Sequence, residues 1–219
     1  MIRQNKLTVV LAALGLVALL AMPATASANL LVNPSLEDTY VDEYGNTVPT
    51  GWGFWMSSWE GWGASWITPH LGDGTAYDGE NAWEHGAGDG GANSGYSMLI
   101  QDIPTATAGV AYTLSCYARD VLEGSTTEPA VKLEFYDAGG GLLWANEVLV
   151  PIADDGNYYY IEQTSTAPEG TAWMKAIFVA TEFSGGQSAY EFDYANLVPE
   201  PGALILLGVG ALAVIRRRR

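Results

Sequence analysis

Apolar and polar residues alternate with a period of two along much of the chain between residues 29 and 198. The segments AVKLEFYD (130–137) and TAWMKAIFVA (171–180) show this alternation most clearly. Such alternation is typical of strands that bury one face. Segments rich in glycine and aspartate, such as DAGGG and ADDGN, separate the runs and predict turns. No long stretch of helical periodicity is free of glycine and proline. We therefore expect about eight to ten strands in an antiparallel β-sandwich, an all-β fold.

The segment GWGFWMSSWEGWGASW (51–66) departs from this pattern. Its tryptophans follow each other at steps of three and four, a spacing that would align them on one face of a helix. Its glycines argue against a helix, because each one inside a helix costs roughly 0.5–1 kcal/mol relative to alanine. The segment therefore predicts an aromatic surface or capping loop that is formed by Trp55, Trp59, Trp62 and Trp66.

The N-terminal 28 residues have the order of a secretory signal peptide. Arg3 and Lys6 precede an apolar run (7–20), and the small-residue segment ATASA ends at Ala28. We expect the Sec translocon and signal peptidase to process this segment, so that the mature chain begins at Asn29.

The C-terminus (199–219) combines a Pro-Glu-Pro triplet, an apolar run (202–215) and four arginines. The run would measure about 21 Å as a helix, which is short for a hydrocarbon core of about 30 Å. We expect it to form a single transmembrane helix whose arginine end stays cytoplasmic. The residues of this segment with an expected role are Pro199, Glu200, Pro201, Arg216, Arg217, Arg218 and Arg219.

This C-terminal segment closely resembles the PEP-CTERM sorting signal. The resemblance implies recognition of the triplet by an exosortase, a membrane-embedded cysteine transpeptidase of Gram-negative bacteria that make exopolysaccharide. It also implies that the transmembrane helix is a transient anchor in the inner membrane. The mature protein is then expected at the bacterial envelope, the cell surface or the extracellular matrix. The alternative is an ordinary C-terminal membrane anchor.

The charge and the cysteine content of the chain limit which partners and which covalent cross-links it can have. Between Asn29 and Pro199 the chain has 24 acidic residues and three basic ones, a net charge near −21 (3 − 24). Nucleic acid, itself an anion, is therefore not an expected partner. Cys116 is the only cysteine, which excludes an intramolecular disulfide. Because its alternating neighbours predict an inward position, we expect a core thiol.

Four segments resemble, in order, the strands of galactose-binding-like jelly rolls, a fold that includes many carbohydrate-binding modules. They are NLLVNPSLED (29–38), YSMLIQDIPTATAGVAYTLSCYARD (96–120), STAPEGTAWMKAIFVA (165–180) and YEFDYANL (190–197). In that family a Gly-Trp pair often begins a strand whose tryptophan packs inside. The resemblance thus implies that Trp52 belongs to the core.

The same resemblance implies a structural calcium ion. The positions that match the family's ligands are Glu37 and Asp193, and the Asp78-Gly79 turn is the candidate for further oxygen ligands. Calcium takes six to eight oxygen ligands at about 2.3–2.6 Å. A cation would also relieve repulsion among the carboxylates of so acidic a domain. The alternative is that Glu37 and Asp193 are solvated charges at strand ends.

Catalytic motifs are scarce. The body has two histidines, His70 and His85, whose spacing does not match a zinc site. It also has no GxSxG nucleophile motif. We therefore expect both histidines to lie in solvated loops. A glycosidase needs only two carboxylates about 5–10 Å apart. Glu60, Glu80 and Glu84 are candidates for such a pair.

The resemblance therefore implies an exported, non-enzymatic carbohydrate-binding module with polysaccharide as its ligand. We expect some of Trp55, Trp59, Trp62 and Trp66 to stack on the sugar rings; the alternative is that all four close the end of the sandwich as packing. Two alternatives stay open. One is a purely structural surface or matrix protein without sugar binding, and the other is an enzyme that acts on polysaccharide.

Overall fold

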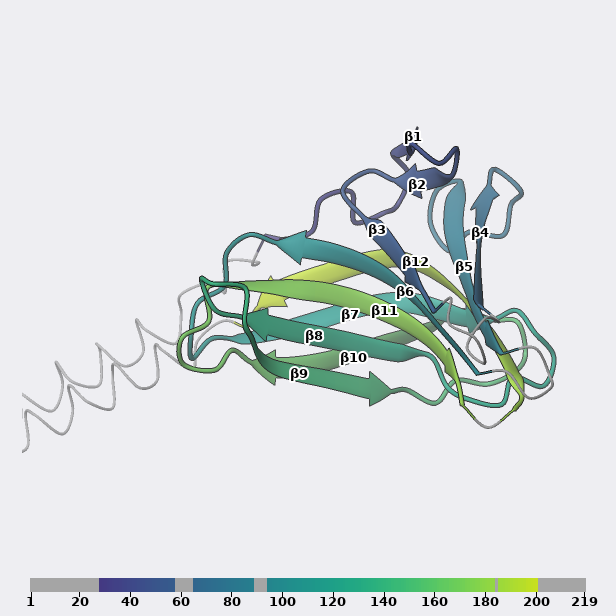
Figure 1. The fold of residues 1–219 in the computed structure, drawn as a ribbon. Helices are drawn as coiled ribbons and strands as arrows, with labels where there is room; N and C mark the ends of the chain where they lie inside the picture. The colour runs from purple at the N-terminus through teal and green to yellow at the C-terminus, as the bar shows by residue number, and fades with distance from the viewer. Residues whose placement is uncertain (1–27, 58–64, 89–93, 184, 201–219) are drawn as a thin grey trace, which may run out of the picture.

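The computed structural model describes residues 28–57, 65–88, 94–183 and 185–200, and these contain twelve strands and no helix (Figure 1). No helix within these ranges is long and apolar enough to cross a membrane. The predicted signal peptide, the predicted anchor (202–215), Trp59, Glu60 and Trp62 lie outside the described residues.

Ten of the strands form two five-stranded antiparallel sheets, which confirms the predicted β-sandwich. The first sheet has the order β10-β7-β12-β5-β4, with bounds Tyr159–Thr166, Ala111–Asp120, Gln187–Pro199, Asn81–Gly88 and Ser65–Leu71. The second has the order β3-β6-β11-β8-β9, with bounds Gly53–Met56, Gly95–Ile103, Trp173–Glu182, Ala130–Tyr136 and Leu142–Leu149. The other two strands, β1 (Thr39–Val41) and β2 (Thr47–Pro49), form a separate hairpin that stands beside the sandwich (Figure 1).

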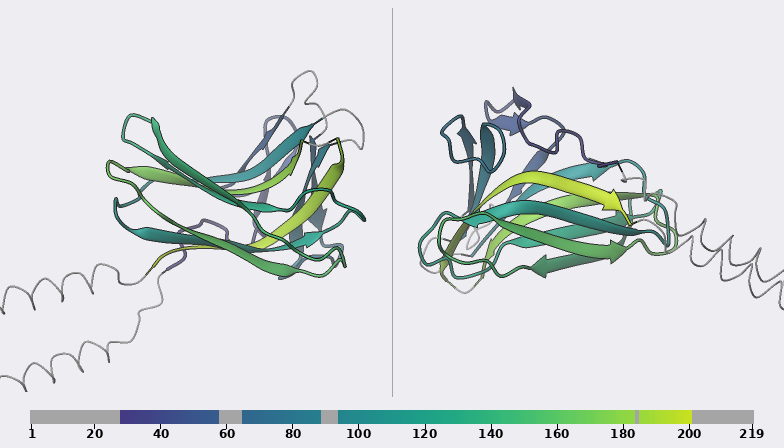
Figure 2. Two further views of the ribbon diagram at one scale, coloured as in Figure 1. Left: turned by 90° about the horizontal axis from the view of Figure 1, so that it is seen from below. Right: turned by 180° about the vertical axis from the view of Figure 1, so that it is seen from behind.

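The core lies between the two bowed sheets (Figure 2, left). The inward residues of the alternating runs are buried as expected, among them Leu133 and Phe178. Trp52 is only 3% exposed, and its ring stacks on that of Phe178 with centroids 5.8 Å apart. Cys116 is buried, and its burial raises the pKa of the thiol well above its usual value. The predictions of a core Trp52 and a core thiol are therefore confirmed.

The prediction that both histidines lie in solvated loops is wrong. His85 is in β5, fully buried, and its ring lies 5.8 Å from the rings of both Phe54 and Phe192. Neither ring nitrogen of His85 has a hydrogen-bond partner among the described residues. Burial lowers the pKa of this imidazole to about 3, so it is neutral at physiological pH. His70 lies in β4, where its ring takes part in a polar network described below.

Candidate functional site

The outer face of the β3-β6-β11-β8-β9 sheet is rich in aromatic and charged residues. Leu99 and Leu133 point into the core, so their neighbours along each strand point outward. We name this surface the Trp55 face. Its members are Trp55, Tyr96, Met98, Ile100, Ala130, Lys132, Glu134, Tyr136, Glu147, Trp173, Lys175, Ile177 and Val179.

The centre of the Trp55 face is apolar. Ala130, Ile177 and Val179 are at most 1% exposed although they point away from the core. Met98 and Ile100 pack against them. These five residues form the apolar floor of the face. The larger side chains around them must therefore project above this floor, at both ends of the face.

Exposed aromatic rings stand at one end of the floor. Trp55 is 45% exposed, and its ring makes a T-shaped contact with the Tyr96 ring at a centroid distance of 5.9 Å. Phe183, just beyond the end of β11, is 54% exposed and lies 6.2 Å from the Tyr96 ring. This end thus offers apolar ring surface to a ligand.

A second aromatic pair stands where β8 and β11 meet at the other end. The rings of Tyr136 and Trp173 stack with centroids 4.1 Å apart and planes 10° apart. The Lys175 ammonium lies 5.5 Å from the centre of the Tyr136 ring, within the range of a cation–π contact. The register places these residues several positions along β11 from Phe183.

Hydrogen-bonding groups lie between the two aromatic ends. Lys132 Nζ is 2.9 Å from Glu134 and 3.4 Å from Glu147. The Tyr96 hydroxyl donates to Glu147 at 2.6 Å, and the Tyr136 hydroxyl donates to Glu134 at 2.5 Å. Burial and the neighbouring carboxylates raise the pKa of both phenols, so both stay protonated at neutral pH. The face thus offers carboxylate acceptors and an ammonium donor side by side.

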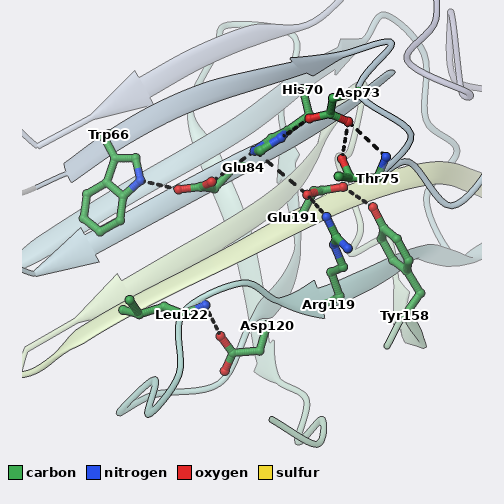
Figure 3. Close-up of polar contacts among 10 residues, drawn as sticks. All are labelled: Trp66, His70, Asp73, Thr75, Glu84, Arg119, Asp120, Leu122, Tyr158 and Glu191. Carbon is green, nitrogen blue, oxygen red and sulfur yellow. Dashed lines mark hydrogen bonds and ion pairs between the residues drawn. The ribbon is translucent and has the colours of Figure 1, made fainter. Parts of the chain in front are cut away.

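The opposite face of the sandwich carries a polar network around Glu191 of β12 (Figure 3). The Glu191 carboxylate is fully buried and accepts hydrogen bonds from Arg119 at 2.6 Å and from the Tyr158 hydroxyl. His70 bridges this network to two further carboxylates, 2.7 Å from Asp73 and 3.1 Å from Glu84. Burial disfavours the imidazolium, but these hydrogen bonds outweigh it and raise the pKa of His70. We name this cluster the Glu191 network.

Trp66 belongs to the edge of the Glu191 network. Its indole N–H donates to Glu84 at 2.5 Å. The indole ring covers Gly86, because a Cβ atom at that position would fall 1.9 Å from the ring. Glycine at position 86 is therefore required for the Trp66 ring to occupy this place.

The structure thus separates the tryptophans that the sequence groups together. Trp55 and Trp66 lie on opposite outer faces of the sandwich, while Trp59 and Trp62 lie outside the described residues. Sequence reasoning missed the other rings of the Trp55 face. The signal for them was present as aromatic residues at the outward positions of YSMLIQ, KLEFY and TAWMK.

The residues proposed for calcium lie around one turn, residues 78–81. The Glu37 carboxylate accepts hydrogen bonds from the backbone N–H groups of Glu80 and Asn81, each at 3.0 Å. The Asp193 carboxylate, fully buried, accepts one from the Asp78 backbone N–H at 2.9 Å. Burial, together with the charge of Glu37, raises the pKa of Asp193 to about 7.

The carboxylates of Glu37 and Asp193 suit calcium chemically, because carboxylates are hard oxygen ligands. Within the described part of the chain, however, no group of three or more acidic, histidine or cysteine side chains is arranged to hold a metal ion. Glu37 and Asp193 would therefore hold the ion only together with backbone carbonyls and water. We propose that they hold a structural calcium ion in this way.

We expect calcium to raise the melting temperature of the protein relative to excess chelator, because binding to the folded state stabilises it by mass action. A ten-fold excess over the dissociation constant gives about 1.4 kcal/mol. The Asp193→Asn variant should lose most of this rise, whereas Asp155→Asn, in an exposed turn, should keep it. An unchanged melting temperature in the wild type would show that the protein has no structural calcium site.

The structure also places part of the expected sorting triplet. Pro199 is the last residue of β12, one residue beyond the expected domain boundary at 198. The Glu200 backbone N–H donates to Ala111 at 2.8 Å, so it is attached to β7. Pro201, Arg216, Arg217, Arg218 and Arg219 lie outside the described residues.

Comparison with known proteins identifies the C-terminal segment. Residues 197–219 match the family described as the PEP-CTERM protein-sorting motif. The chain therefore carries a PEP-CTERM signal, which implies exosortase processing and export to the cell envelope or surface. No curated protein matches the chain in sequence.

Solved structures with the same fold are mainly carbohydrate-binding modules. The xylan-binding domain CBM22-1 of Paenibacillus barcinonensis Xyn10C matches with a TM-score of 0.51 and 15% identity, over 83% of this chain and 100% of that one. A family 16 carbohydrate-binding module matches with a TM-score of 0.50 and 15% identity, over 78% and 99%. The enzymatically active domain of bacteriophage CBA120 tailspike protein 4 matches with a TM-score of 0.56 and 13% identity. This match covers 78% of the chain but only 21% of the tailspike structure. The fold is therefore that of the carbohydrate-binding-module β-sandwiches.

Proposed function

We propose that this exported protein binds polysaccharide on the Trp55 face, without catalysis, in the envelope or the extracellular matrix. The observation that carries the proposal is the layout of this face. Exposed rings at Trp55 and Phe183 and the Tyr136–Trp173 pair lie on either side of an apolar floor. A pyranose ring has an apolar face of C–H groups, which an aromatic ring can cover, and hydroxyls at its edge.

The polar groups of the face suit those hydroxyls. Glu134 and Glu147 supply acceptors, and Lys132 supplies a donor between them. Two of the three basic residues of the body, Lys132 and Lys175, lie on this face although the body has 24 acidic residues. The carboxylates next to Lys132 are thereby partly neutralised, which lowers the cost of bringing an uncharged sugar against them.

Single substitutions should locate the binding surface. We expect Trp55→Ala to weaken binding to a matching polysaccharide about tenfold, because a lost aromatic stacking contact of about 1.4 kcal/mol corresponds to that factor. Trp144→Ala is the matched control, since Trp144 is 54% exposed at the sandwich edge but is not on the Trp55 face. Affinity electrophoresis of the purified full chain against a panel of neutral and acidic polysaccharides measures the change.

Equal losses in both variants, or no loss in either, would contradict the proposal. If no polysaccharide binds the wild type, the purely structural alternative gains support. Release of reducing sugar from a polysaccharide by the wild type would instead support an enzyme.

A further inference from the structure

Strand β12 contains an irregularity that redirects one tyrosine. The register of β12 against β7 shifts between Asp193 and Asn196, which is a β-bulge. Tyr194, inside the bulge, has a φ of 49°, a left-handed conformation that is uncommon for residues other than glycine. Such strained residues cluster at binding sites, where the surrounding structure holds them in place.

A pocket of about 320 Å³ lies next to this bulge, on the outer face of the sheet β10-β7-β12-β5-β4. This face and the Trp55 face are on opposite sides of the sandwich. We name this cavity the Tyr194 pocket. It is lined by Asn29, Pro34, Ser35, Ser115, Tyr117, Tyr160, Tyr194, Ala195 and Asn196.

Tyrosine rings form the walls of the Tyr194 pocket. Tyr160 and Tyr194 are 53% and 47% exposed. The centroid of the Tyr117 ring lies 5.6 Å from that of Tyr160 and 6.4 Å from that of Tyr194. Tyr77 stacks on the Tyr117 ring at 3.6 Å, with planes 13° apart, and so braces this ring from another loop.

The backbone of the pocket is held by hydrogen bonds to the N-terminal segment. The Ala195 N–H donates to the Pro34 carbonyl at 2.7 Å. The Ala195 carbonyl accepts from the Asn29 side-chain amide at 3.1 Å. The Asn29 side chain also accepts from the Leu197 N–H at 2.9 Å. These bonds hold the backbone of the pocket in place, which reduces the entropy cost of binding.

The lining is neutral, although the domain is strongly acidic. Among the residues that line the pocket none is an Asp, Glu, Lys, Arg or His. Because the Asn29 amide holds the backbone, the polar groups left for a ligand are the amide of Asn196, the hydroxyls of Ser35 and Ser115, and the phenols. Aromatic walls with amides and hydroxyls suit a ligand with an apolar face and a hydroxyl edge. At about 320 Å³ the space lies at the lower end of small-molecule sites, which span about 300–1,000 Å³.

We propose that the Tyr194 pocket is a second saccharide site that takes a single uncharged sugar unit. Together with the Trp55 face it gives the domain two sites on opposite faces, so that one molecule bridges two polysaccharide chains. The bridging rests on the function proposed above, whereas binding in the pocket does not.

The test uses two variants and one control in the full chain. Tyr194→Gly removes the ring while suiting the positive φ, so the backbone is expected to stay folded. Trp55→Ala removes the other site. Tyr44→Ala is the control, because Tyr44 is 80% exposed on the hairpin outside both sites. Calorimetric titration with a panel of neutral mono- and oligosaccharides gives the number of sites, and thermal unfolding confirms folding.

We expect two sites per chain in the wild type and in Tyr44→Ala, and one site in each of the other variants. Only proteins with both sites should bind a labelled soluble polysaccharide to beads coated with the same polysaccharide. A single wild-type site that Trp55→Ala abolishes and Tyr194→Gly leaves intact would overturn the pocket but keep the proposed function. A single site that only Tyr194→Gly abolishes would keep the pocket and overturn the bridging and the function of the Trp55 face. Absence of any binding would overturn both the saccharide site in the Tyr194 pocket and the proposed function of the Trp55 face. If Tyr194→Gly unfolds, Tyr160→Ser replaces it in the same comparison.

Discussion

Replacing Arg119 by methionine is expected to lower the free energy of unfolding by about 3 kcal/mol, the lower end of the range for breaking a buried ion pair. The Glu191 carboxylate is fully buried, and the Arg119 guanidinium 2.6 Å away is its nearest cation. Without that cation, Glu191 keeps the Tyr158 hydroxyl, and the ring of His70 at 4.0 Å. A buried carboxylate would then lack most of its compensation. Urea unfolding of wild type and variant at neutral pH measures the difference.

Lys175→Met is the matched control for this experiment. Lys175 lies 3.8 Å from Asp102, which is 69% exposed, so the pair is solvated. Its loss should change the free energy of unfolding by at most about 1 kcal/mol. The double variant Arg119→Met/Glu191→Leu should recover part of the stability, because no buried charge is then left unpaired. Equal effects of Arg119→Met and Lys175→Met would show that the Glu191 network does not hold the sheet together.

Acid is expected to destabilise the protein through His85. The pKa of this imidazole is about 3 in the folded state, whereas that of an unfolded histidine is about 6.5. Between these values the unfolded chain binds a proton that the folded chain does not, so stability falls as the pH drops below about 6.5. At pH 5 the loss from this one group is about 2 kcal/mol, from 1.5 pH units at 1.36 kcal/mol each.

The His85→Leu variant isolates this contribution from the other titrating groups. Leucine suits the apolar site between Phe54 and Phe192 and has no proton to bind. The difference in unfolding free energy between wild type and variant should therefore change by about 2 kcal/mol from pH 7 to pH 5. Measurement at several pH values by chemical denaturation decides the matter. A constant difference over this range would show that His85 is not buried in its neutral form.

Local patterning was sufficient to predict the sandwich. The alternation in 130–137 and 171–180 specifies which residues of β8 and β11 face the core, and the structure places them there. The sequence pattern did not predict strands β4 and β5, because this part of the sequence has the composition of a loop. Strand β4 contains Pro69, and the loop that follows is rich in aspartate and glycine. Strand β5 is specified by its pairing with β12, and β4 by its pairing with β5; a local pattern contains neither of these contacts.

The candidate sites were only partly predictable for a similar reason. Trp55 and Trp66 are close in sequence, but β3 and β4 belong to different sheets, so the two side chains point to opposite faces. The Tyr194 pocket depends on a bulge that only the register of β12 against β7 reveals. In contrast, Glu37 and Asp193 were grouped through the family resemblance, and the structure brings both near the Asp78 turn.

Chemical-shift mapping on the isotopically labelled protein tests the central proposal most directly. A neutral oligosaccharide taken from a polysaccharide that binds the protein is titrated, and the backbone amide signals are followed. We expect the largest shifts on the strands of the Trp55 face, around Trp55, Tyr96, Lys132 and Ile177. A smaller set is predicted around Tyr194. Shifts confined to strands outside both sites, with the Trp55 face unchanged at saturation, would contradict the central proposal.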